Sequence, residues 1–153
     1  MKIAICQINP TMGDFPGNRD KILSFYNESV QKGADLIVFP EMVITGYPPQ
    51  DLLLDSNFIY QTAQMLESIK KIVEEQIVII GFPRKKENNL FNSAAVINKG
   101  DIIGYHDKIL LPTYDVFDED RYFTAGENVG ITKMVIGGKN RKIGIQICED
   151  LWD

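Results

Sequence analysis

Hydrophobic residues in the first half of the chain alternate between short continuous runs and a helical spacing. The runs at residues 2–7, 36–39 and 77–83 are mostly apolar, which is typical of strands buried on both faces of a sheet. Between these runs, apolar side chains three or four positions apart predict two helices, one from Asn18 as its cap to about residue 32 and one over residues 56–75. The first half therefore predicts strands alternating with helices.

The pattern changes in the second half, where two pairs of β-rich segments are each joined by a short turn. "LFNSAAVI" and "IIGY" flank the turn "NKGD", and "ITKMVI" and "RKIGIQIC" flank the turn "GGKN". Both pairs are typical of antiparallel hairpins. A loop rich in aromatic and acidic residues separates them, from His106 to about residue 128. We expect one α/β domain with a mixed sheet.

Composition excludes several classes of function. A net charge of −5 over 153 residues argues against electrostatic binding of nucleic acid or of acidic membrane surfaces. No apolar run is long enough for a membrane span. Cys6 and Cys148 both lie in strand-like runs of a chain without signal-peptide features, so we expect reduced thiols and a cytoplasmic location. One histidine and two separated cysteines give no recognisable set of metal ligands, so we expect no metal.

Three ionisable residues follow predicted strands, at positions where open α/β sheets bind ligands. Glu41 comes just after the second run, Lys108 follows the first hairpin, and Cys148 ends the second hairpin. Each also has an ordinary interpretation: a solvated loop glutamate, a surface lysine and a core cysteine, as we expect of Cys6. Glu149 and the residues after it are expected to begin a helix, whose amino end favours a thiolate at Cys148.

A cysteine nucleophile needs a base to take its proton. His106, the sole histidine, precedes Lys108 by two residues and would share a face with it on a strand, so it is one candidate. A glutamate base with a lysine that stabilises negative charge is the other solution. The residues alone leave both open.

Three segments together resemble the nitrilase superfamily of carbon–nitrogen hydrolases. They are "FPEMVITGYPPQDLL", "HDKILLPTYDVFDEDRYF" and "IGIQICEDLWD", in this order and spacing. The resemblance implies a four-layer αββα sandwich with a Glu–Lys–Cys triad. By motif, Glu41 corresponds to the general base, Lys108 to the lysine that stabilises the oxyanion, and Cys148 to the nucleophile. Glu119 matches a second family glutamate that orients the lysine and the substrate.

Within these segments, the sequence is similar to the glutaminase domain of glutamine-dependent NAD⁺ synthetases at "GYPPQDLL", "LPTYDVFDEDRYF" and "ICEDLWD". This resemblance implies hydrolysis of L-glutamine, with the ammonia used for ATP-dependent amidation of deamido-NAD⁺. Tyr114 and Tyr47 would contact the glutamine, and the backbone N–H of Glu149 would help to hold the oxyanion. It implies no cofactor in this segment, and ATP with Mg²⁺ for a synthetase domain that the 153 residues do not contain.

Family amidase domains continue well beyond the nucleophile, so we expect residues 1–153 to be the amino-terminal part of a truncated αββα sandwich. Two alternatives to the glutaminase stay open. One is a different nitrilase-type amidase that uses the same triad on another amide or nitrile. The other is a non-catalytic assembly module whose uncovered sheet face pairs with another copy, since exposed apolar faces favour association. We expect a homo-oligomer.

Overall fold

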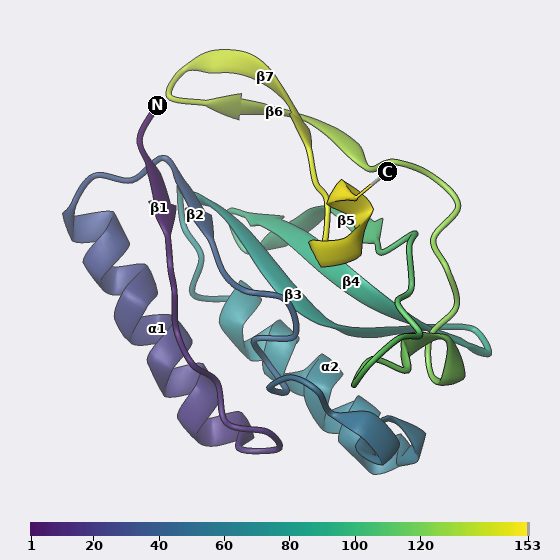
Figure 1. Cartoon of the computed structure of the whole chain (residues 1–153). Helices are drawn as coiled ribbons and strands as arrows, with labels where there is room; N and C mark the ends of the chain where they lie inside the picture. The colour runs from purple at the N-terminus through teal and green to yellow at the C-terminus, as the bar shows by residue number, and fades with distance from the viewer. Residues whose placement is uncertain (153) are drawn as a thin grey trace.

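A five-stranded mixed sheet forms the centre of the molecule in the computed structural model, which describes residues 1–152 (Figure 1). The strands lie side by side in sequence order, with the first three parallel and the last two antiparallel to their neighbours. The α/β class and the mixed sheet predicted from the sequence are confirmed. The strands are β1 (Ile3–Ile5), β2 (Leu36–Val38), β3 (Ile77–Lys86), β4 (Asn89–Asn98) and β5 (Asp101–Asp107).

Two helices, α1 (Phe15–Gln31) and α2 (Ser56–Lys70), pack on one face of this sheet (Figure 1). The prediction that Asn18 caps the first helix is wrong, because Asp14 is the cap and accepts a hydrogen bond from Gly17 N at 3.0 Å. Asn18 lies inside α1, fully buried, and its side chain bonds the backbone of Thr11 and Ile44 instead. The second helix ends at Lys70, five residues earlier than predicted.

The opposite face of the sheet is covered by a separate hairpin, β6 (Ile131–Ile136) and β7 (Lys139–Gly144). Successive side chains of a strand point to opposite faces, and the burial follows this alternation. Ile37, Val78 and Ile80 belong to the core under the helices, whereas Leu36, Ile77 and Ile79 belong to the core under the hairpin. The result is three layers, helix, sheet and sheet, of the expected αββα sandwich.

Both predicted hairpins form, but their boundaries differ from the prediction. The predicted strand at residues 141–148 ends at Gly144, and the next three residues belong to no strand or helix. A further hairpin, between β3 and β4, was not predicted, because Pro83 normally interrupts a strand. Here β3 continues through Pro83, which lies opposite Asn92.

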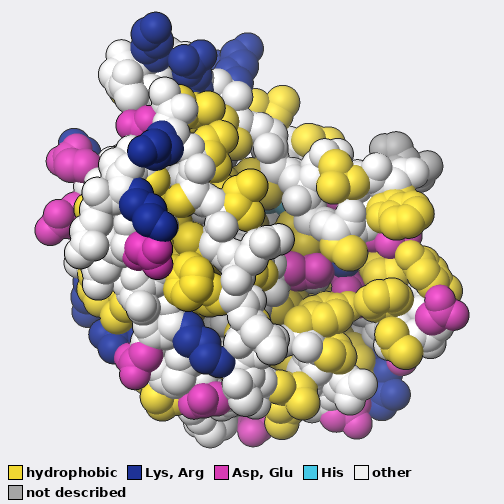
Figure 2. Space-filling model, turned by 60° about the vertical axis from the view of Figure 1, so that its left-hand side comes forward, with side chains coloured by type: hydrophobic (Ala, Val, Ile, Leu, Met, Phe, Trp, Pro, Cys, Tyr) yellow, Lys and Arg dark blue, Asp and Glu magenta, His cyan; other side chains and the backbone are white. Residues whose placement is uncertain are grey.

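The sheet edge at β1 leaves apolar side chains exposed, with Ile5 76% and Ile3 47% accessible. These two residues lie at the mouth of a cavity between the sheet and β7. Figure 2 shows hydrophobic side chains around a hollow in which acidic side chains are visible. None of the helices formed by residues 1–152 is long and apolar enough to cross a membrane.

Candidate active site

Glu41 owes its position to a close crossing of two backbones. The segment after β2 passes over Gly81 of β3, where an added Cβ would lie 2.6 Å from the Pro40 carbonyl oxygen and 2.8 Å from the Glu41 Cα. No larger residue fits there without moving this segment, so Gly81 fixes the height of Glu41 above the sheet. Met42 follows with a φ of +52°, which turns the chain sharply.

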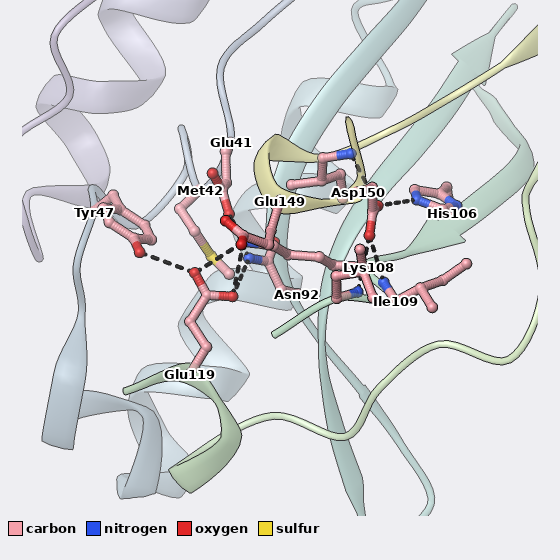
Figure 3. Close-up of polar contacts among 12 residues, drawn as sticks. Glu41, Met42, Tyr47, Asn92, His106, Lys108, Ile109, Glu119, Glu149 and Asp150 are labelled. Atoms are coloured by element: carbon pink, nitrogen blue, oxygen red, sulfur yellow. Dashed lines mark hydrogen bonds and ion pairs between the residues drawn. The ribbon is translucent and has the colours of Figure 1, made fainter. Parts of the chain in front are cut away.

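Lys108 follows β5 directly and is fully buried. Its backbone N–H donates to Asn92 O at 2.8 Å, and its Nζ lies 3.1 Å from Glu41 Oε1 and 2.9 Å from Glu119 Oε2 (Figure 3). Burial lowers the pKa of Lys108, but the two carboxylates outweigh burial and raise it above its usual value. The lysine is therefore charged, because a buried ammonium persists where carboxylates pair with it.

Two further side chains hold the carboxylates in place (Figure 3). Asn92, on β4, donates from Nδ2 to Glu41 Oε1 at 2.6 Å and to Glu119 Oε2 at 3.4 Å. The Tyr47 hydroxyl donates to Glu119 Oε1 at 2.9 Å, and burial together with Glu119 raises the pKa of Tyr47, so it stays a neutral donor. Sequence reasoning missed Asn92; its one signal is a polar pair, Asn92 and Ser93, in an otherwise apolar strand.

Cys148 faces the cavity that also contains Glu41, a space of about 460 Å³ between the two sheets. It begins a single 3₁₀ turn, Cys148–Leu151, with a φ of +47°. The pKa of its thiol is raised by burial and by Glu41, which together outweigh Lys108 and the backbone N–H of Glu149. The expected helix is only one turn, so the expectation of a lowered pKa is wrong. The resting group is a thiol, and it needs a base.

Cys6 is a core residue on the helix side of the sheet, 3% exposed. Its sulfur lies 3.6 Å from Ser29 Oγ, and burial raises its pKa. Both cysteines are free thiols.

His106 does not join the cluster around Lys108. It lies on β5, 2% exposed, with Nε2 2.8 Å from Asp150 Oδ2. The sequence argument that it would share a face with Lys108 does not apply, because β5 ends at Asp107 and Lys108 lies beyond the strand. The ring is therefore engaged by Asp150, and Glu41 is the carboxylate that shares a cavity with Cys148.

Tyr114 and Glu149 contact each other, with the Tyr114 hydroxyl 2.8 Å from Glu149 Oε2. They line a second cavity, bounded by residues 109–114 and Trp152, beside the cluster. Within residues 1–152, neither side chain makes a hydrogen bond or ion pair with Lys108 or Glu41, so their roles toward a substrate stay predictions. The same residues hold no group of three or more His, Cys, Asp or Glu side chains placed to bind a metal ion.

The site thus combines a buried lysine between two glutamates with a cysteine at a strained elbow that shares a cavity with one of them. The carbon–nitrogen hydrolase family profile matches residues 2–152, so the chain belongs to this family. An amidase from Nesterenkonia sp., 21% identical, superposes with a TM-score of 0.81 over 99% of this chain and 56% of its own, which shows the same fold.

More similar proteins are glutamine-dependent NAD⁺ synthetases. Those of Thermotoga maritima and Synechocystis sp. are each 40% identical over 100% and 99% of this chain. The synthetase structure from Acinetobacter baumannii, with ADP bound, is 35% identical and superposes with a TM-score of 0.90 over 98% of this chain. The chain spans 26% and 28% of the lengths of the first two relatives and 28% of the third.

Proposed function

We propose that this chain is the catalytic part of a glutamine amidohydrolase, and that the complete protein uses the released ammonia to amidate deamido-NAD⁺ to NAD⁺ at the expense of ATP. The observation that supports the amidase is the fully buried Lys108, paired with Glu119 and with Glu41, which lines the same cavity as Cys148. Glutamine is supported by the relatives that are 33–40% identical over nearly the whole chain.

The proposed reaction starts with a neutral thiol. Glu41 takes the proton of Cys148 Sγ, and the thiolate attacks the carboxamide carbon of glutamine. Lys108 has three N–H donors, of which two are engaged by Glu41 and Glu119, so one is free for the developing oxyanion. The backbone N–H of Glu149, which lowers the pKa of the neighbouring Cys148 thiol, is the second donor. Each such donor is worth about 10²–10³-fold in rate.

Collapse of the intermediate breaks the carbon–nitrogen bond. Glu41 returns its proton to the leaving nitrogen, ammonia departs, and a γ-glutamyl thioester remains on Cys148. Glu41 then takes a proton from water, which attacks the thioester and releases glutamate and the thiol. A positioned base of this kind contributes about 10²–10⁴-fold to each step. Glutamine and water give glutamate and ammonia, with no redox change.

Recognition of the substrate is proposed to involve Tyr47, Tyr114, Glu119 and Glu149. Tyr47 and Glu119 line a pocket of about 280 Å³ behind the cluster, and Tyr114 with Glu149 lines the cavity on its other side. ATP and Mg²⁺ would serve a synthetase region outside residues 1–153. A cytoplasmic homo-oligomer is supported by the two free thiols and by the exposed apolar edge at Ile3 and Ile5.

The test uses the full-length protein and compares L-glutamine with asparagine and simple nitriles in steady-state assays. Glutamine should be hydrolysed with a clear preference. Cys148→Ala should lose glutamine hydrolysis and glutamine-dependent NAD⁺ synthesis, yet keep synthesis from added ammonia, because that chemistry belongs to another region. Preference for a nitrile would favour a different nitrilase-type amidase. Near wild-type synthesis from glutamine in Cys148→Ala would make Cys148 structural.

A further inference from the structure

The side chain of Asp150 is buried, with the residue only 8% exposed, and its carboxylate accepts four hydrogen bonds. Oδ1 accepts from the backbone N–H groups of Ile109 at 2.9 Å and Leu110 at 3.0 Å. Oδ2 accepts from Ile147 N at 3.0 Å and lies 2.8 Å from His106 Nε2 (Figure 3). Burial raises the pKa of Asp150, but these donors together outweigh it and hold the pKa below its usual value. The group is therefore an anion with its acceptor sites filled.

The three backbone donors come from two segments that carry the proposed reactive groups. Ile147 immediately precedes Cys148, whereas Ile109 and Leu110 immediately follow Lys108. One carboxylate thus joins the segment of the nucleophile to the segment of the oxyanion donor, one residue away from each. These bonds span about 40 residues of sequence, so no local secondary structure provides the same connection.

The elbow at Cys148 needs such a constraint. Its φ of +47° lies in the left-handed region, which costs a residue with a side chain on the order of 1–3 kcal/mol and persists where surrounding contacts determine it. Asp150 supplies three of these contacts. Its carboxylate accepts from Ile147 N, its own N–H donates to Ile147 O at 3.1 Å, and its carbonyl accepts from Gln146 Nε2 at 3.1 Å.

His106 orients the Asp150 carboxylate through its bond to Oδ2. Gly130 N–H donates to His106 Nδ1 at 3.3 Å, so Nδ1 is the acceptor and Nε2 carries the ring hydrogen. That hydrogen points at Asp150 Oδ2. The histidine that the sequence offered as a base for Cys148 is instead a neutral donor to the carboxylate that holds the elbow.

We propose that Asp150, oriented by His106, is a positioning residue that fixes Cys148 relative to Lys108 for oxyanion stabilisation. The proposal rests on the amidase function above. It predicts a selective defect, because a misplacement of about 1 Å costs roughly 10²-fold in rate while the thiol itself stays present and accessible. Removing the Asp150 carboxylate, which clamps the two segments together, should affect steps that form an oxyanion. It should spare a displacement at a carbon atom in which the sulfur is the nucleophile and no oxyanion forms.

Asp150→Asn in the full-length protein tests this. The amide keeps the size of the side chain but turns an N–H₂ group toward backbone donors. We expect kcat for glutamine to fall about 10²-fold with KM changed by less than about threefold. Alkylation of Cys148 by iodoacetamide, which displaces iodide without an oxyanion, should stay within about threefold of wild type at the same pH.

Three more variants complete the experiment. His106→Gln places an amide N–H near the ring Nε2 and should retain most of the activity, whereas His106→Leu should resemble Asp150→Asn. Asp107→Asn is the matched control, since Asp107 adjoins Lys108 but its carboxylate bonds only Arg84 and Ser93 among the described residues. It should lower thermal stability and leave kcat within about threefold of wild type.

The outcomes separate the two proposals. The positioning role would be overturned if Asp150→Asn kept the wild-type kcat. It would also be overturned if glutamine hydrolysis and alkylation were lost together, in step with unfolding. Either result would leave the proposed amidase function intact. A wild-type protein that alkylates at Cys148 but hydrolyses no glutamine would overturn the proposed function. In that case the same variants are compared on the asparagine and simple amides that the wild type accepts, and an unchanged rate again rejects the clamp.

Discussion

Lys108 carries a positive charge at a position with no exposed surface, and this is possible because two carboxylates and Asn92 surround it. Removing one member of a buried ion pair is strongly destabilising, because the remaining charges lose their partner. The cluster is therefore tied to stability as well as to the proposed chemistry. A surface ion pair such as Lys99 with Glu75, both largely exposed, has no comparable role.

Lys108→Met should destabilise the protein by about 3–5 kcal/mol and lower kcat at least about 10²-fold. Because the carboxylates raise the pKa of Lys108, its stabilising effect is complete below the ordinary lysine value of about 10.4 and is lost as the pH rises through the raised value. The stability deficit should therefore be full at neutral pH and shrink only at alkaline pH. Denaturant unfolding between pH 7 and 11 measures it. A deficit no larger than that of Lys99→Met would contradict the prediction.

The thiol of Cys148 gives a second prediction at this scale. Its pKa is raised by burial and by Glu41 against the opposing effect of Lys108, so iodoacetamide alkylation should reach half its maximal rate above the reference pH of about 8.5. Glu41→Gln should lower this midpoint and Lys108→Met should raise it. Peptide mapping of the label provides the control, because buried Cys6 should stay unlabelled. A midpoint below that of free cysteine would restore the helix-end interpretation.

At the level of elements, the periodicity of the sequence predicts the strands, the two helices and both hairpins, since each reflects the burial of one face or both. Boundaries set by tertiary contacts are not predicted. Asn18 is a good helix cap by residue type, but its amide bonds Thr11 and Ile44, which no local pattern reveals. The roles of Asp150 and Asn92 are not predicted for the same reason, because their hydrogen-bond partners lie about 40 and 50 residues away in the sequence.

Gly81 shows how an element without chemistry determines the site. Gly81→Ala should displace the Pro40–Met42 segment, because the new Cβ would meet backbone atoms at 2.6–2.8 Å that cannot give way cheaply. We expect a loss of about 1–3 kcal/mol in stability and, through Glu41, a fall in kcat of about 10²-fold. Unfolding and glutamine assays measure both.

Gly144→Ala is the matched control for stability, since it lies at the end of β7 and an added Cβ meets no atom within 4 Å. Its unfolding free energy should stay within about 0.5 kcal/mol of wild type. Equal destabilisation by the two alanines would show that the loss at Gly81 does not come from the crossing with Pro40.

The whole molecule combines a closed core under the helices with an open one under β6 and β7. The helix side buries its apolar residues thoroughly, whereas the groove beside β1 leaves Ile3 and Ile5 in solvent. Cys148 and Glu41 line the same groove, so whatever covers this apolar edge also closes the cavity of the proposed reaction and removes water from it. We therefore expect association and the proposed catalysis to be connected through this one surface.

The 153-residue chain on its own should therefore associate with itself, because an exposed apolar edge strand pairs readily with another copy. Light scattering after gel filtration at increasing concentration should show a rising mass. Ile5→Lys places a charge on this edge and should shift the chain toward the monomer. Leu54→Lys is the control, since Leu54 is 68% exposed, close to the 76% of Ile5, but lies at the end of the short helix Gln50–Leu54, outside the residues that line the groove. If both lysines acted alike, or if the unmodified chain stayed monomeric at about 100 µM, a concentration at which weak contacts of roughly 5–6 kcal/mol are populated, the β1 edge would not be the surface that brings copies together.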